Sequence, residues 1–237
     1  MPRGRTSLGL CGLADPAAWR EGYNEVVGLS EELVEALLAA GIRDRRVLDA
    51  FRKVPREEFV PRESRDRACE DVPLPIPHAQ VTTQPSLIAR MIEALALQGS
   101  ERVLEIGTGF GFQTALLAVL AGEVWSVERW GDVARCARVN LARVGIDNAH
   151  VVVGDGTRGL PEHHPFGAIV VSAAFTDVPE PLAAQLAPRG RLVQPIGPGG
   201  REQVTLFVED GGRLRREAVL TGAYFVRLVG AHGFQKG

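Results

Sequence analysis

The chain has 237 residues, a length that suits one α/β domain with room for an accessory segment. Its 27 basic and 29 acidic residues nearly balance, which excludes a general electrostatic attraction to nucleic acid or anionic lipid. The scattered cysteines Cys11, Cys69 and Cys136 have no histidine at ligand spacing, so no metal site is predicted. No apolar run has the length of a membrane span or the pattern of a signal peptide, and we expect no membrane contact and a cytoplasmic location.

The N-terminal third is predicted to be helical after a loosely ordered extension over residues 1–29, where glycines interrupt every periodic pattern. Ser30 is predicted to cap a helix that keeps its apolar spacing up to Gly41. Asp44 is predicted to cap a second helix that ends before Pro55. Residues 30–237 are therefore expected to form one domain. Its parts are a helical and loop segment over 30–98, a ligand-binding core over 99–200 and C-terminal strands over 201–237.

A proline-rich run over 71–87 predicts an ordered loop, and loops of this length ahead of a sheet are often functional. A helix is expected over about 87–97. Apolar strand patterns then alternate with helical ones, which predicts an α/β fold with a Rossmann-like, doubly wound and mainly parallel sheet. Two further apolar runs around Asp210–Gly212 predict a C-terminal antiparallel hairpin. The expected elements are strands at 103–106, 124–127, 150–153, 168–173, 191–196, 203–208 and 218–229, and helices at 112–121, 131–144 and 180–187.

A glycine-rich turn follows the first of these strands, in VLEIGTGFGFQTALLA over 103–118. In a doubly wound sheet this turn faces the ligand, and Gly107, Gly109 and Gly111 let the backbone approach it closely. A dinucleotide fingerprint needs glycine where Phe112 stands, and no phosphate-binding P-loop sequence is present. The pattern therefore disfavours an NAD-dependent dehydrogenase.

Acidic residues stand at the ends of three successive strands. Glu128 is placed to accept hydrogen bonds from ribose hydroxyls, and Asp155, beside Gly156, from an adenine amino group. Glu105 would repel a pyrophosphate but suits a ligand that carries an amino group and a sulfonium. S-adenosylmethionine has both groups and is the predicted cofactor. The predicted cofactor site also includes the neighbouring residues Thr108, Gln113, Thr114 and Arg129.

Several blocks outside this general pattern resemble one family. They are VPREEFVP at 54–61, EDVPLPIPHAQVTTQPSLIARMIEAL at 70–95, GDGTRGLPEHHPFGAIVVSAA at 154–174 and RGRLVQPIGPGG at 189–200. With the glycine turn they resemble the protein-L-isoaspartate O-methyltransferases, over about residues 44–233. The resemblance implies a class I methyltransferase fold with S-adenosylmethionine as the methyl donor. The implied substrate is the free carboxylate of L-isoaspartyl residues in damaged proteins or peptides, and we expect a monomer.

The resemblance also assigns roles in the loop before the core. The family's serine falls on Thr83, which keeps the hydroxyl and is the implied catalytic residue. The implied substrate-binding residues are Thr82, Gln84, Pro85 and Val226. The loop departs from the family at Pro77, Ala79, Val81, Thr82 and Thr83, and Arg227 stands where proline is usual. Two alternatives therefore stay open: a relative that methylates another carboxylate, such as aspartate in a modified peptide, and a non-catalytic S-adenosylmethionine-binding module.

Overall fold

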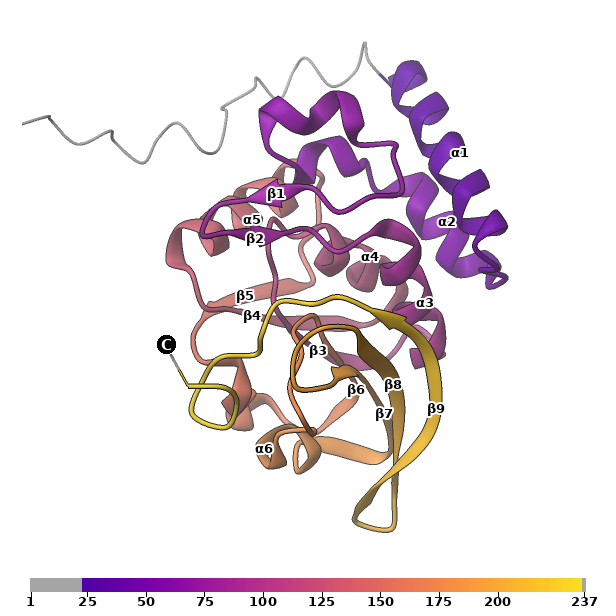
Figure 1. The fold of residues 1–237 in the computed structure, drawn as a ribbon. Coiled ribbons are helices and arrows are strands. Elements are labelled where there is room, and N and C mark those ends of the chain that lie inside the picture. Colours follow the sequence, from indigo (N-terminus) through magenta and orange to yellow (C-terminus); the bar gives the residue numbers. More distant parts are fainter. Residues whose placement is uncertain (1–22, 236–237) are drawn as a thin grey trace, which may run out of the picture.

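A seven-stranded sheet forms the centre of the computed structural model, which describes residues 23–235, with side chains described from residue 31 (Figure 1). Its strand order is β5-β4-β3-β6-β7-β8-β9; β3 to β7 run parallel, and β8 and β9 are antiparallel additions. The predicted doubly wound sheet with a C-terminal hairpin is thus confirmed. The strands are β3 (Arg102–Ile106), β4 (Glu123–Glu128), β5 (Ala149–Val153), β6 (Phe166–Val171), β7 (Leu186–Ile196), β8 (Glu202–Asp210) and β9 (Arg213–Ala223).

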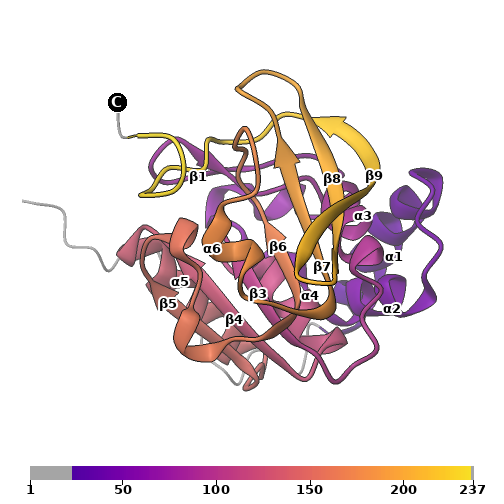
Figure 2. The same ribbon diagram turned by 90° about the horizontal axis from the view of Figure 1, so that it is seen from below.

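Helices cover both faces of the sheet, and successive strand residues point to opposite faces. Val103 belongs to the core shared with α1 to α4, whereas Leu104 belongs to the core on the other face, shared with α6. Figure 2 separates α1 to α3 from α6 in the same way. The α-helices are α1 (Tyr23–Ala39), α2 (Arg45–Lys53), α3 (Pro85–Leu95), α4 (Phe112–Leu120), α5 (Gly131–Arg143) and α6 (Glu180–Ala183). The 3₁₀ helices are η3 (Arg56–Phe59), η4 (Arg62–Arg67), η5 (Gly156–Arg158) and η6 (Pro161–His163).

The helical N-terminal part differs from the prediction at its beginning. The first helix starts at Tyr23 and not at Ser30, so it crosses the boundary predicted between extension and domain. Val26 and Val27 stand seven residues before Leu33 and Val34, and this spacing continues the apolar pattern across Gly28. The predicted cap of α2 is confirmed, because the Asp44 side chain accepts a hydrogen bond from the backbone N–H of Arg46. The rest of the predicted extension, residues 1–22, lies outside the described residues.

Three other segments differ from their predicted form. The proline-rich loop contains a small hairpin, β1 (Pro75–Ile76) and β2 (Gln80–Val81), where no regular structure was predicted. Strand β7 begins at residue 186, within the span predicted as helix, so α6 is confined to one turn. Strand β9 ends at residue 223, and the chain then leaves the sheet and returns to the carboxyl ends of the parallel strands. These differences arise from tertiary pairing, which the local pattern does not contain.

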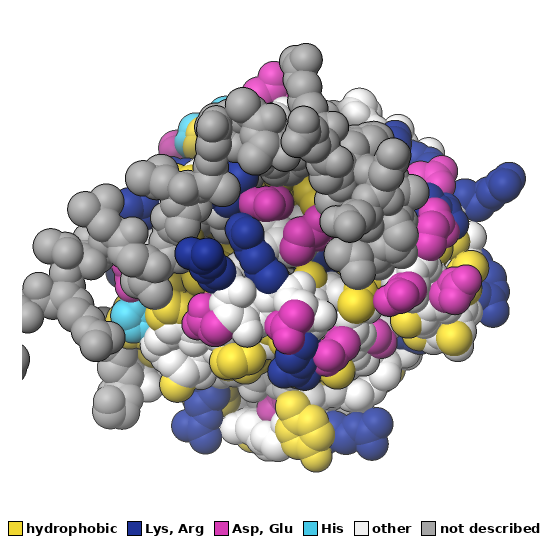
Figure 3. Space-filling model, turned by 90° about the horizontal axis from the view of Figure 1, so that it is seen from above, with side chains coloured by type: hydrophobic (Ala, Val, Ile, Leu, Met, Phe, Trp, Pro, Cys, Tyr) yellow, Lys and Arg dark blue, Asp and Glu magenta, His cyan; other side chains and the backbone are white. Residues whose placement is uncertain are grey.

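The face of the molecule in Figure 3 carries both acidic and basic side chains. On the part of that face not covered by undescribed residues, acidic and basic side chains alternate, and no broad basic patch forms. The balance of charges in the composition is therefore also a balance in space on that face. None of the helices described has both the length and the apolar character that crossing a membrane requires.

Candidate active site

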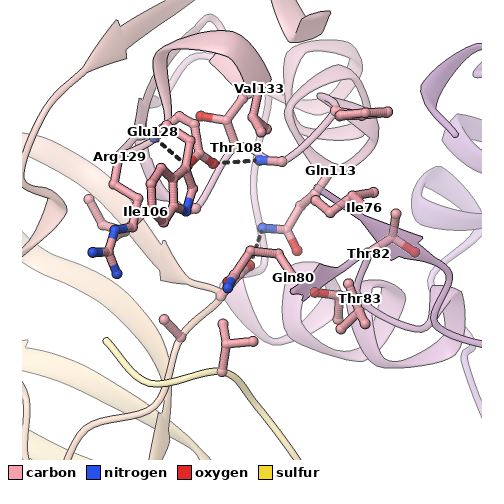
Figure 4. A pocket seen from close by; sticks show the side chains of 18 of the residues that line it. Ile76, Gln80, Thr82, Thr83, Ile106, Thr108, Gln113, Glu128, Arg129 and Val133 are labelled. Carbon is pink, nitrogen blue, oxygen red and sulfur yellow. Dashed lines mark hydrogen bonds between the residues drawn. The ribbon is translucent and has the colours of Figure 1, made fainter. Parts of the chain in front are cut away.

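A cavity of about 260 Å³ opens at the carboxyl ends of β3 and β4, beside the turn after β6 (Figure 4). Strands β4 and β6 flank β3 on opposite sides, so the chain reverses its direction of winding at this point. In doubly wound sheets such a reversal leaves a crevice in which ligands bind. We call this space the first cavity. The described part of the chain contains no cluster of acidic, histidine or cysteine residues that could hold a metal ion.

The glycine turn between β3 and α4 forms the floor of the first cavity. Gly107 and Gly109 both line it and have φ angles of +96° and +56°, a backbone region that side chains with a Cβ rarely adopt. The N–H of Gly107 donates to the carbonyl of Val127, which ties the turn to β4. Gly111 has another use and does not line the cavity. Its φ of +97° at the N-terminus of α4 explains the glycine, since a Cβ there would meet Ala137 of α5 at ordinary contact distance.

Glu128 lies on the cavity wall as predicted, at the end of β4. Its Oε2 accepts a hydrogen bond of 3.0 Å from the N–H of Gly109, and its Oε1 accepts one of 3.0 Å from the N–H of Trp130. Burial raises the pKa of this carboxyl, although these backbone donors oppose the shift. A carboxylate can accept about four hydrogen bonds. Glu128 therefore keeps acceptor capacity for a pair of hydroxyls in the cavity.

Glu105 does not line the cavity, so the predicted direct contact with a ligand is not what the structure shows. The carboxylate is fully buried beneath the glycine turn and accepts hydrogen bonds from Gln113 Nε2, Thr114 Oγ1 and Ser126 Oγ. Burial raises its pKa to about 7 in spite of these three donors. Thr114 is also fully buried and lies outside the cavity wall. Both residues support the turn and the first helical turn of α4 from below.

Gln113 connects this buried group to the cavity. Its Nε2 donates to Glu105 and also to Ser172 Oγ at 3.0 Å, whereas its buried Oε1 has no partner among the described residues. The side chain lines the cavity and is 6% exposed (Figure 4). An unpaired buried acceptor is costly unless a ligand donates to it. The site thus fits a ligand that carries an amino group at this point.

Some of the other residues predicted for the cofactor site line the first cavity, and one lies outside it. Thr108, Arg129 and Gly156 line the first cavity, but Asp155 does not. Asp155 Oδ1 accepts from the N–H and the hydroxyl of Thr157, and its Oδ2 accepts from the N–H of Ala231. Burial opposes ionisation of Asp155, but these hydrogen bonds hold its pKa below the usual value. Asp155 thus attaches the C-terminal segment, and its predicted contact with adenine stays a prediction.

A second cavity, of about 490 Å³, adjoins the first. Both are lined by Val81, Thr82, Thr83, Ser172 and Val226, so Thr83 stands where the two spaces join. Thr82 Oγ1 accepts a hydrogen bond from the N–H of Leu74 and holds the loop together. Gln84 lines only the second cavity and not the first, and its Nε2 donates to Asp71. Pro85 is buried as the first residue of α3 and lines neither cavity, so the predicted contact with substrate is not found there.

Arg56 is a buried residue of the cavity wall that the sequence pattern did not reveal. It is 3% exposed and lines the first cavity, and its guanidinium donates to the carbonyls of Ala68, Glu70 and Val72. Burial lowers its pKa to about 10. Its position in VPREEFVP was the one available signal, because nothing in the local pattern predicts a buried arginine. This side chain fixes the base of the loop that carries Thr83.

Two further side chains lie beside the site. His78 bonds through Nε2 to both carboxylate oxygens of Asp132. Arg227 is exposed at the rim of the first cavity, with its guanidinium carbon 5.1 Å from the ring centre of Phe234. Among the described residues it has no carboxylate partner. Its guanidinium is therefore available to solvent or to a bound ligand.

A mainly parallel sheet with an antiparallel end, and a glycine-lined cavity closed by an acid at the tip of the second strand, define the class I methyltransferases. Residues 29–233 match one family of this class, described as Protein-L-isoaspartate(D-aspartate) O-methyltransferase. The chain belongs to this family.

Relatives and solved structures agree with this assignment. The Protein-L-isoaspartate O-methyltransferase of Methanoculleus marisnigri is 50% identical over 206 residues, which cover 86% of this chain and 93% of the relative. Protein-L-isoaspartate O-methyltransferase 2 of Pelobacter propionicus is 45% identical over 231 residues, covering 94% and 98%. A solved protein-L-isoaspartate O-methyltransferase superposes with a TM-score of 0.77 at 32% identity, covering 86% of this chain and 67% of that one. A Plasmodium falciparum structure in complex with S-adenosyl-L-homocysteine shares the fold, with a TM-score of 0.72 at 23% identity and coverage of 83% and 96%.

Proposed function

We propose that this chain transfers a methyl group from S-adenosylmethionine to the free carboxylate of L-isoaspartyl residues in damaged proteins or peptides. Membership of the family supports both the reaction and the cofactor. The observation that carries the proposal is the place of Thr83, between a glycine-lined cavity and a second cavity at the surface. We further propose that the chain acts as a monomer in the cytoplasm.

The residues of the first cavity fit S-adenosylmethionine. Glu128 would accept hydrogen bonds from the two ribose hydroxyls, since the two backbone N–H groups that donate to it leave acceptor capacity free. The unpaired Oε1 of Gln113 would accept one from the amino group of the methionine part. Gly156 lines the cavity and lets the turn after β5 approach β3 closely, because a Cβ at this position would lie 2.4 Å from Ile106 Cγ2. When bound, the cofactor supplies an electrophilic methyl group.

The reaction asks little acid–base chemistry of the protein. A substrate carboxylate is already ionised at neutral pH, so no general base is required. The hydroxyl of Thr83 would donate a hydrogen bond to one carboxylate oxygen and orient the other toward the first cavity. Because Arg56 and Thr82 hold the loop in place, this hydroxyl is positioned before substrate binds. Catalysis then comes from alignment and from exclusion of water by Ile76 and Val226, which line the cavity.

The substrate class is tested with two versions of one peptide, isoaspartyl and aspartyl, and S-adenosylmethionine labelled in its methyl group. We expect label on the isoaspartyl peptide alone. Thr83→Ser should keep most of the activity, whereas Thr83→Val should lower kcat/KM about tenfold to hundredfold, the worth of a hydrogen bond to a charged group. Label on the aspartyl peptide alone would reject repair and favour a relative with another carboxylate substrate, which the altered residues Pro77, Ala79 and Val81 motivate. Nucleoside binding without turnover would favour a non-catalytic module.

A further inference from the structure

The hairpin of β1 and β2 closes one side of the first cavity. Ile76, Gln80 and Val81 line the cavity, and the strand continues directly into Thr82 and Thr83 (Figure 4). A Cβ at Gly109 would lie 3.8 Å from Ile76 Cδ1, so the hairpin packs directly on the glycine turn. One short segment therefore borders the nucleoside end of the cavity and also leads to the proposed catalytic hydroxyl.

The tip of this hairpin is attached to the start of α5 through His78. The imidazole ring stacks on the ring of Trp130, with centres 3.9 Å apart and planes at 6°. Its Nε2 lies 3.0 Å from each carboxylate oxygen of Asp132. Trp130 also lines the first cavity, and its backbone N–H donates to Glu128, the residue placed to hold the ribose. The stack thus joins the hairpin to the turn that forms the opposite wall of the cavity, and Figure 1 shows β1 beside α5.

The tip of the hairpin has few hydrogen bonds to the rest of the described structure. Among the described residues, only the hydrogen bonds of His78 to Asp132 join residues 75–81 to another element. The backbone of the tip is also strained, since His78 and Ala79 have φ angles of +63° and +53° without being glycine. A segment with few external bonds and internal strain opens more easily than the core around it.

We propose that His78 is a positioning residue that latches the hairpin over the bound nucleoside and so sets how long the nucleoside stays bound. The proposal rests on the function proposed above, because it takes S-adenosylmethionine or its demethylated product as the occupant of the first cavity. Nucleoside and latch stabilise the same closed hairpin. By linkage, loss of the latch therefore weakens nucleoside binding, and bound nucleoside protects the hairpin.

Three variants separate the parts of the latch. His78→Asn removes the ring but keeps the turn, since asparagine tolerates a positive φ. His78→Phe keeps a ring on Trp130 and removes the bonds to Asp132, and Asp132→Ala removes the acceptor from the other side. A matched control is His150→Asn. His150 also stacks on a tryptophan, Trp125 at 4.4 Å, and lies 3.4 Å from a carboxylate, Glu123, but it does not line the first cavity.

The experiment measures binding and release of S-adenosylhomocysteine by the full chain, with folding of each variant checked by circular dichroism. We expect His78→Asn to raise both Kd and the dissociation rate about tenfold, which is the combined effect of one aromatic stack and one hydrogen bond. His78→Phe and Asp132→Ala should show smaller increases, and His150→Asn none.

Hydrogen exchange gives a second readout that does not depend on turnover. The amides of residues 75–81 should exchange faster in His78→Asn than in the unmodified protein, and bound nucleoside should slow them. If His78→Asn and Asp132→Ala bind and release the nucleoside as the unmodified protein does, the latch is rejected while the proposed function stands. If the unmodified protein binds no nucleoside, it is the proposed function that fails.

Discussion

Two glutamates at neighbouring strand ends illustrate how surroundings decide the role of a residue. Glu128 faces the first cavity and is held by backbone donors from the adjoining turns. Glu105 is one strand away, yet it is enclosed by Gln113, Thr114 and Ser126. Burial raises the pKa of both carboxyls, to about 7 for Glu105. One acid is therefore placed to bind ligand, while the other organises the residues that do.

The raised pKa of Glu105 predicts a pH dependence of stability. The unfolded chain releases this proton near pH 4.5 and the folded chain near pH 7, so the folded state loses stability as the pH rises through this window. The loss is about 3 kcal/mol at about 1.4 kcal/mol for each pH unit. Glu105→Gln removes the titration, and its stability relative to the unmodified protein should increase from pH 5 to pH 8. Urea unfolding at both pH values measures this; a constant difference between the two proteins would contradict a buried titrating carboxyl.

Among the elements, the β1–β2 hairpin is the one whose residues relate most directly to the proposed function. Its turn needs two consecutive residues with positive φ, the geometry of a type I′ turn. Such turns favour glycine, yet this chain has His78 and Ala79. The histidine is explained by its contacts with Trp130 and Asp132. Ala79 is exposed and makes no comparable contact, so its strain has no compensation in the described structure.

Relief of this strain is a prediction at the scale of the element. Ala79→Gly should stabilise the protein by about 0.5–1 kcal/mol, because the penalty for a Cβ in the left-handed region exceeds the added freedom of glycine in the unfolded chain. The same substitution within helix α1, Ala36→Gly, should instead destabilise by about 0.5–1 kcal/mol. Urea unfolding measures both. A loss of stability in Ala79→Gly would mean that the turn does not hold this backbone conformation.

At the scale of the whole molecule, the segment after β9 returns to the carboxyl ends of β5 and β6. After β9 the chain crosses the carboxyl ends of the sheet, where the N–H of Ala174 donates to the carbonyl of Val226. Asp155 and Thr157 then hold the N–H groups of Ala231 and His232. The wall of the active site contributed by Val226 therefore depends on contacts of the C-terminal segment with the turns that follow β5 and β6.

Asp155 is the residue whose change should loosen this arrangement. Asp155→Asn removes the charge from the hydrogen bonds of Thr157 and Ala231, which should cost about 1–2 kcal/mol of stability and speed amide exchange at residues 230–232. Asp210→Asn is a matched control, since its exposed carboxylate lies 3.6 Å from Arg215 and far from these contacts in the sequence. Unchanged exchange together with lost nucleoside affinity would instead indicate an adenine contact for Asp155.

The sequence by itself determined the features that depend on neighbouring residues. Alternating apolar strands and helices predicted the parallel sheet, Asp44 predicted its helix start, and the glycines after Ile106 predicted the turn at the ligand cavity. These signals are local, because periodicity and capping act within a few residues. Glu128 was also predictable, since the end of the second strand has a fixed place in this topology.

Only the tertiary structure decided which of the predicted residues face the cavity. Glu105, Thr114 and Asp155 look equivalent to Glu128 and Thr108 in a linear pattern, but their hydrogen-bond partners place them outside the first cavity. The contacts of Arg56 and His78 have the same origin, since Val72 and Asp132 are brought to them by the fold. Burial and hydrogen bonding are set by residues distant in the chain, and no local pattern contains them.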